Sequence, residues 1–176
     1  MKLIEAMNAL KLTEKKLSQQ LGIIQRYAAR PSFRDDAFGK PGEETKQIKA
    51  AIQAANDLIA YHEKIKRQID YTNMMTMVKI GKQEHSIHSL ILHKRTLLKL
   101  KVAVYSALSD VQAQQEIAQL RSRSSDQKLN AQVVYNYDLQ ERESKLTELM
   151  ELSSAIDSAL QIANAKVELL EVPEAK

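Results

Sequence analysis

The side chains best suited to chemistry lie together in the stretch EHSIHSLILHK, residues 84–94. On a helix, Glu84 and His88 stand four residues apart and His85 stands three before His88, so the three share one face. A carboxylate and two imidazoles are ligands that zinc or a similar metal accepts. A closed site needs a further ligand, and His93 is turned away from His85. We therefore predict no metal site. Glu84, His85 and His88 are the residues that would form one, and a partly exposed first helical turn is the simpler interpretation.

The rest of the sequence offers no catalytic arrangement. Cysteine is absent, which excludes disulfides, thiolate nucleophiles and cysteine-ligated zinc. His62 falls on the apolar face of its predicted helix, where a polar core residue that fixes helix register is a simpler interpretation than a catalytic group. The sequence therefore predicts a protein that is not an enzyme and has no cofactor.

A basic stretch follows the histidines. It consists of Lys94, Arg95, Lys99, Lys101, Arg121 and Arg123. Lys94 and Lys101 share one helix face and could follow a phosphate backbone. No aromatic side chain for base stacking lies among them. The sequence from residue 138 onward carries nine acidic against four basic residues, so it offers the basic stretch a protein partner, within one chain or between chains. Nucleic-acid binding is therefore the alternative prediction.

Composition points to helices. The chain has 176 residues with four glycines, three prolines and no tryptophan, which favours helices over sheets and suits a single domain over residues 1–176. No stretch approaches the roughly 18 apolar residues needed to cross a bilayer, and the N-terminus lacks the apolar core of a signal peptide. We expect no membrane association and a cytoplasmic location.

Apolar residues recur with helical spacing in four segments, which predicts helices over residues 2–27, 44–71, 82–120 and 139–171. A loop rich in proline and glycine spans residues 28–43, and the polar residues 121–130 form a turn. The apolar stripe of the first helix is Leu3, Met7, Leu10, Leu17, Leu21 and Ile24. That of the second is Ile48, Ile52, Ala55, Ile59, His62 and Ile69, reinforced by Leu58 and Ile65.

In the third segment, apolar pairs recur every seven residues at Leu90-Ile91, Leu97-Leu98 and Val104-Tyr105. This stripe is wider than a contact between two helices requires and indicates at least two neighbours. The predicted fold class is mainly α: an elongated antiparallel four-helix coiled-coil bundle with two short β-strands at the connections between helices. Asp138, with Glu141 three residues later, is the expected N-cap of the last helix.

Two short segments read as strands. Thr76, Val78 and Ile80 would project to one side of an extended chain, which predicts a strand over residues 75–80. The segment AQVVYNYD predicts a second strand over residues 132–137, with Val133, Tyr135 and Tyr137 on one face. An unbroken helix over residues 82–120 would be about 57 Å long, which is too long for the two strands to pair within one chain.

Unpaired strand edges attract other chains, so we predict an oligomer in which these strands pair between copies. The expected contact residues are Met75, Met77, Val78, Ile80, Val133, Tyr135 and Tyr137.

Several short stretches resemble one protein family. They are MKLIEAM at the start, IDYTNMMTMVKIG with its Ile-x-x-Thr-Asn element, and RSRSS, YDLQERESKLTEL and SALQIANAKVEL in the second half. In these the chain resembles the DIP1984-like family of uncharacterised bacterial helical proteins, sometimes labelled septicolysin-like. The sequence departs from the family pattern at Ala165, where the family tends to carry tryptophan.

The resemblance implies a helical protein, and the septicolysin label suggests a pore-forming toxin, for which the residues give no support. Our prediction is a non-catalytic, oligomerising structural or scaffold protein that acts through protein–protein contacts. One form of it is an accessory protein of a bacteriophage particle, at the capsid or neck, assembled in the cytoplasm. This form rests on analogy with other compact helical proteins.

Overall fold

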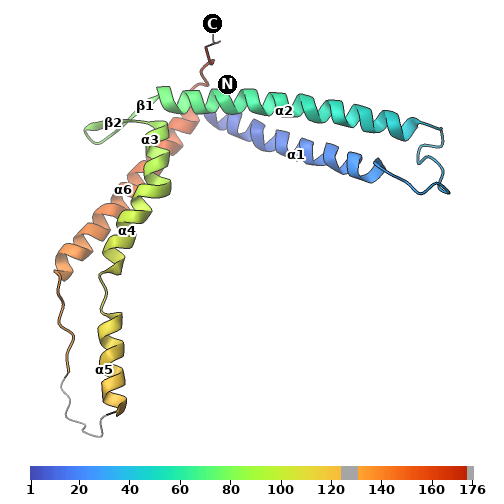
Figure 1. Ribbon diagram of the computed structural model, residues 1–176. Coiled ribbons are helices and arrows are strands. Elements are labelled where there is room, and N and C mark those ends of the chain that lie inside the picture. Colours follow the sequence, from blue (N-terminus) through green and yellow to red (C-terminus); the bar gives the residue numbers. More distant parts are fainter. Residues whose placement is uncertain (124–130, 174–176) are drawn as a thin grey trace. The chain divides into compact units, whose positions relative to one another are not determined.

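The computed structural model describes residues 1–123 and 131–173, and it is mainly helical, as the composition predicts (Figure 1). A small two-stranded antiparallel sheet accompanies the helices. The chain clusters into two compact units. Unit 1 holds Met1–Val78, Ser86–His88 and Gln161–Lys176, and unit 2 holds Lys79–His85 and Ser89–Leu160. The single domain over residues 1–176 and the four-helix bundle, which we predict from the sequence, are not tested by these features and remain predictions.

Unit 1 is built on a helical hairpin of α1 (Leu3–Tyr27) and α2 (Glu43–Met75), which pack against each other (Figure 1). The positions shielded from solvent recur in alternating steps of three and four residues, a seven-residue repeat. They are Leu3, Ala6, Leu10, Thr13, Leu17, Gln20, Ile24 and Tyr27 in α1, and Glu44, Ile48, Ala51, Ala55, Leu58, His62, Ile65, Ile69 and Thr72 in α2.

This seam differs from the predicted stripe of α1 at every second position, whereas in α2 the predicted Leu58 and Ile65 do lie in the seam. Met7 and Leu21 of α1 are 41% and 47% exposed, and Ile52 and Ile59 of α2 are 44% and 50% exposed. Ala6, Thr13 and Ala51 lie in the seam instead. Small side chains at these places let the two helices approach closely, and the larger residues one position later face outward.

His62 lies in the seam, as its spacing predicts, and its Nε2 lies 3.3 Å from Glu14 Oε1 on α1. The contact joins residues 48 positions apart and therefore reports the register of the two antiparallel helices. The loop that joins them is held by a second polar contact. Glu44, buried at the start of α2, pairs with Arg30 at 3.0 Å and accepts a hydrogen bond from the amide of Ala37.

The N-terminal residues and the segment 167–170 meet near the end of α2. The predicted last helix, residues 139–171, ends earlier, because α6 (Leu139–Lys166) gives way to an extended segment. That segment pairs antiparallel with the N-terminus: Leu3 N donates to Val167 O at 3.0 Å and Leu169 N donates to Met1 O at 2.8 Å. The next amide, that of Leu170, donates to the hydroxyl of Thr72 at 2.9 Å.

The predicted strand at residues 75–80 finds its partner within the chain, contrary to our prediction. β1 (Met77–Ile80) pairs with β2 (Gln83–Ser86), which we had assigned to the third helix. Gly81, with φ of +59°, is the first of two turn residues, as a type II′ hairpin turn requires. Val78 and Ile80 are half-buried and Met77 and Lys79 exposed, so the predicted alternation of faces is present.

The helix predicted over residues 82–120 is divided. It begins as α3 (Ile87–Leu92), continues through a π-helical turn, η1 (His93–Leu97), and ends as α4 (Leu98–Ala107). After a break at residues 108–110, α5 runs over Val111–Arg123. The carbonyl of Asp110 accepts the amide of Gln114 at 2.9 Å, so Asp110 is the N-cap of α5, a helix-start signal that our prediction missed.

The predicted strand at residues 132–137 is an extended segment without a strand partner in the described chain. Its tyrosines hold it in place. Tyr135 OH donates to Asp110 Oδ2 at 2.8 Å, and Tyr137 OH donates to Leu108 O at 3.0 Å. Asp138 then caps α6, as predicted, by accepting the amides of Gln140 and Glu141. The predicted turn at residues 121–130 lies mostly outside the described residues.

Replacing Thr72 with valine should destabilise the protein. The Thr72 side chain is fully buried, and its hydroxyl donates to Gln68 O and accepts the amide of Leu170. Valine keeps the shape but leaves that amide without its acceptor, which costs about 1–3 kcal/mol. Urea denaturation gives the change in the free energy of unfolding, and hydrogen exchange at Leu170 should become faster.

Thr13 is the matched control. It is also buried, and its hydroxyl donates to Ala9 O within its own helix at 2.8 Å. Thr13→Val should therefore change the free energy of unfolding by much less. Equal losses in the two variants would contradict the role assigned to Thr72.

Candidate interaction surface

The most conspicuous surface of unit 2 is the outer face of α4. Leu97, Leu100 and Val104, at successive steps of three and four residues, are 42%, 60% and 65% exposed. We call these three residues the α4 stripe. On the opposite side of the helix Leu98 is buried, and Val102 and Tyr105 are half-buried. α4 is therefore apolar on two opposite faces.

The α4 stripe has charged borders. Lys99 and Lys101 lie on either side of it, and both are exposed. η1 and α4 are tied to α6 by the ion pair of Lys94 with Asp157 and by the hydrogen bond from Arg142 Nε to Tyr105 O. A helix with a second apolar face normally packs against a second neighbour, so the α4 stripe is a candidate contact surface.

The π-helical turn decides which residues face outward. In a regular helix, Leu90 and Leu97 would share a face, since seven residues make two turns. η1 inserts one residue into this count, so that the buried residue after Leu90 is Leu98, eight positions on. Leu97 consequently moves outward. Of the predicted Leu97-Leu98 pair, Leu98 is therefore buried and Leu97 faces outward.

Beyond α4, the helix α5 is accompanied by the extended segment 131–137. Arg121 donates to Ala131 O at 3.3 Å, and Tyr135 and Tyr137 form an edge-to-face ring pair with centroids 5.6 Å apart. The Tyr135 hydrogen bond is the largest cause that lowers the pKa of Asp110, and the same bond raises the pKa of Tyr135. Val134 in this segment is 80% exposed.

The seven predicted contact residues divide into two groups. Met75, the last residue of α2, and Met77 of β1 are 57% and 56% exposed, whereas Val78 and Ile80 are half-buried in the hairpin. Val133 and Tyr137 are half-buried and Tyr135 is 39% exposed. β2 occupies one edge of β1, and the outer edge of this two-stranded sheet has no strand partner in the described chain, so pairing between copies at this strand stays a prediction.

The candidate metal ligands are not arranged as the helical spacing required. Glu84 and His85 are neighbours in β2, whose side chains alternate between faces, and His88 lies in α3. Within residues 1–123 and 131–173, no group of three or more His, Asp and Glu side chains is placed to hold a metal ion. Nε2 of His93, in η1, is buried without a hydrogen-bond partner.

The predicted basic stretch is spread over three elements. Lys94 and Arg95 lie in η1, Lys99 and Lys101 in α4, and Arg121 and Arg123 in α5. Lys94 pairs with Asp157, so the acidic last helix supplies the internal partner that the charge distribution suggests. Arg95, Lys99 and Lys101 are exposed.

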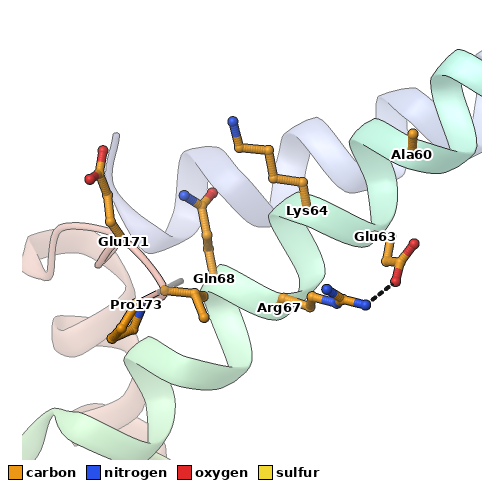
Figure 2. A pocket seen from close by; sticks show the side chains of 8 residues that line it. Ala60, Glu63, Lys64, Arg67, Gln68, Glu171 and Pro173 are labelled. Atoms are coloured by element: carbon orange, nitrogen blue, oxygen red, sulfur yellow. Dashed lines mark hydrogen bonds and ion pairs between the residues drawn. The ribbon is translucent and has the colours of Figure 1, made fainter. Parts of the chain in front are cut away.

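Unit 1 also contains an open groove of about 930 Å³ between α2 and residues 171–173 (Figure 2). Figure 2 shows the ion pair of Glu63 with Arg67 on its wall. Two acidic and two basic residues line the groove, so its charges favour neither an anionic nor a cationic ligand. The lining residues are Ala60, Glu63, Lys64, Arg67, Gln68, Glu171, Val172 and Pro173.

Comparisons with known proteins show the fold. A crystal structure of a functionally unknown conserved protein from Corynebacterium diphtheriae matches this chain with a TM-score of 0.50 and 20% sequence identity, over 97% of this chain and 99% of that one. At this identity the likeness concerns the fold alone. No family model and no curated protein matches the sequence.

No helix within the described residues has the length and apolar character to cross a bilayer.

Tyr135→Phe should raise the pKa of Asp110 toward its ordinary value, because it removes the hydrogen bond that lowers it most. An NMR titration of the Asp110 carboxyl measures this pKa. Tyr137→Phe is the control, since the Tyr137 hydroxyl donates to Leu108 O instead. An unchanged Asp110 pKa in Tyr135→Phe would refute the assignment.

The same shifts predict when the segment 131–137 is held most firmly. Folding lowers the pKa of Asp110. The stabilisation that this carboxylate gives the folded state is therefore complete above its pKa in the unfolded chain and is lost as the pH falls through its pKa in the folded chain. Folding raises the pKa of Tyr135. The stabilisation that its protonated hydroxyl gives the folded state is therefore lost as the pH rises through the pKa of Tyr135 in the folded chain.

Proposed function

We propose that this protein is a non-catalytic helical assembly protein whose copies bind one another through the α4 stripe. The observation that carries the proposal is the exposure of Leu100 and Val104, at 60% and 65%, on a helix whose opposite face is already buried. Burial of apolar side chains is the main driving force of association. Each fully buried side chain of this size contributes about 1.5–3 kcal/mol.

A second copy of the chain is the partner we favour, because its charges fit. Lys99 and Lys101 border the α4 stripe, and α6 carries exposed acidic residues, among them Glu141, Glu148 and Glu151. In a two-fold dimer, α4 of each copy packs beside α6 of the other, and the lysines of one copy face acids of its partner. Two helix pairs then make a four-helix bundle between copies, which differs from the bundle within one chain that the sequence predicts.

We also propose that the chain belongs to the DIP1984-like family. The short motifs support this, and so does the shared fold with the Corynebacterium diphtheriae protein. Three of these stretches, residues 1–7, 69–81 and 158–169, supply the N-terminal residues, Thr72 and the extended C-terminal segment that meet at the end of α2. A cytoplasmic scaffold, or an accessory protein of a phage particle, is the form of assembly that we propose.

Replacing Leu100 and Val104 together with glutamine should weaken self-association at least about 100-fold, since four apolar side chains leave each dimer interface. Glutamine supports helices and adds no charge. The side chains are exposed in the single chain, so thermal stability of the dissociated form should change little. Sedimentation equilibrium over a range of protein concentrations measures the association constant.

Leu12→Gln is the control, because Leu12 is a 53% exposed leucine of α1 outside its seam. It should leave association unchanged. A wild-type chain that stays monomeric at about 100 µM, roughly a hundredfold above a Kd of about 1 µM, would contradict the proposal.

The alternative is association with nucleic acid through Arg95, Lys99 and Lys101, and their exposure supports it. Lys94 is left out of the test because it pairs with Asp157. Changing the three residues to glutamine should, on our proposal, preserve the four-helix arrangement and weaken assembly only through lost ion pairs. Salt-sensitive binding of DNA or RNA by the wild type, abolished in this variant, would favour the alternative instead.

A further inference from the structure

The helical hairpin of unit 1 has an apolar face that its seam does not use. Met7, Leu21, Ile52 and Ile59 are each 41–50% exposed. Met7 and Leu21 directly follow Ala6 and Gln20 of the seam by one residue, and Ile52 directly follows Ala51 and Ile59 directly follows Leu58 in the same way. All four residues therefore occupy the same place in the seven-residue repeat. We call them the hairpin face.

The four residues lie on one side of the hairpin. Glu14 falls midway between Met7 and Leu21 in the repeat, and its side chain contacts His62, one helical turn beyond Ile59. The side of α1 that bears Met7 and Leu21 is therefore the side on which α2 bears Ile52 and Ile59. Lys16 and Ala54 line a groove together with Gln20 and Leu58, and they occupy the equivalent places on the other side of the seam.

A hairpin of two helices needs an apolar seam of two residues in seven, whereas a helix in a four-helix bundle buries about three. Adding the hairpin face to the seam gives α1 and α2 the wider stripe. A stripe of this width is suited to packing against another pair of antiparallel helices.

The charges of the hairpin face favour a second copy of the same hairpin. The two charged residues at equivalent positions are already paired within the chain, Glu14 with His62 at 3.3 Å and Lys66 with Asp70 at 3.0 Å. A partner therefore needs no complementary charge, and an identical face satisfies this condition. The α4 stripe differs, because Lys99 and Lys101 beside it need acidic partners. The hairpin face cannot supply them, since its one acidic residue, Glu14, is already paired with His62.

We infer that the hairpin face is a second interface, at which Met7, Leu21, Ile52 and Ile59 of two copies pack together around a two-fold axis. The inference does not rest on the α4 stripe, which is a separate surface in unit 2. Each chain then has two different two-fold interfaces. Such a chain forms a closed tetramer or a longer assembly and does not stop at a dimer.

Four forms of the full chain test this by light scattering: the wild type, Ile52→Gln/Ile59→Gln, Leu100→Gln/Val104→Gln, and the combination of all four substitutions. We expect the wild type to exceed a dimer, each double variant to be a dimer, and the combination to be a monomer. Each double variant should weaken its own interface at least about 100-fold.

The two proposals fail in different ways. If the hairpin face is not an interface, the Ile52/Ile59 variant has the mass of the wild type and the Leu100/Val104 variant is a monomer. If the α4 stripe is not one, these two results are exchanged. If all four forms are monomers, both proposals are overturned.

A second measurement guards against variants that fail to fold, and it uses the absence of native cysteine. Ile59→Cys should form a disulfide between copies on mild oxidation, because the Glu14–His62 contact places Ile59 near the middle of the hairpin face, where a two-fold axis brings equivalent residues together. Asp57→Cys, in the groove on the other side of the seam, should not. Equal cross-linking of both variants, or none of Ile59→Cys in a folded chain, would refute the inference.

Discussion

The hydroxyl of Thr72 is the contact on which the arrangement of unit 1 depends. It sits fully buried at the end of α2 and accepts the amide of Leu170, directly after the backbone pairing of residues 167–169 with the N-terminus. The pairing holds the first residues of α1 and the last segment of the chain, and the hydroxyl fixes both to α2. Residues from three distant parts of the sequence therefore fold together at one point, and the α1–α2 hairpin extends from it.

Both candidate interfaces have one physical origin, which is an apolar stripe wider than the contact that the chain itself makes. In α1 and α2, small seam residues such as Ala6 and Ala51 bring the helices close and turn Ile52 and Ile59 outward. In α4, the π-helical turn places Leu98 inside and Leu97 outside. In both places the exposed residues follow the helical repeat, which distinguishes them from apolar residues scattered singly over a surface.

Sequence reasoning could predict the features that depend on local pattern. The helical composition, the place of His62, the cap at Asp138 and the alternation of Val78 and Ile80 follow from spacing and residue type. The hairpin partner β2 was missed because Gln83–Ser86 has polar residues of low strand propensity, although Gly81-Lys82 is a turn signal. The use of Ala6 instead of Met7, and of Ala51 instead of Ile52, could not be predicted, because Leu3, Leu10 and Leu17 belong to both patterns. The exposed stripe of α4 depends on η1, for which the sequence carries no signal that we know.

The most direct test of assembly through α4 is the reactivity of one introduced thiol. The chain has no cysteine, so Val104→Cys reports on the α4 stripe alone, and its rate of modification can be followed as the protein is diluted. A second copy that covers the stripe predicts slow modification in concentrated protein and fast modification after dilution. A rate that stays the same at every concentration, whether fast or slow, would contradict the account, since the stripe would then be either uncovered or covered by its own chain.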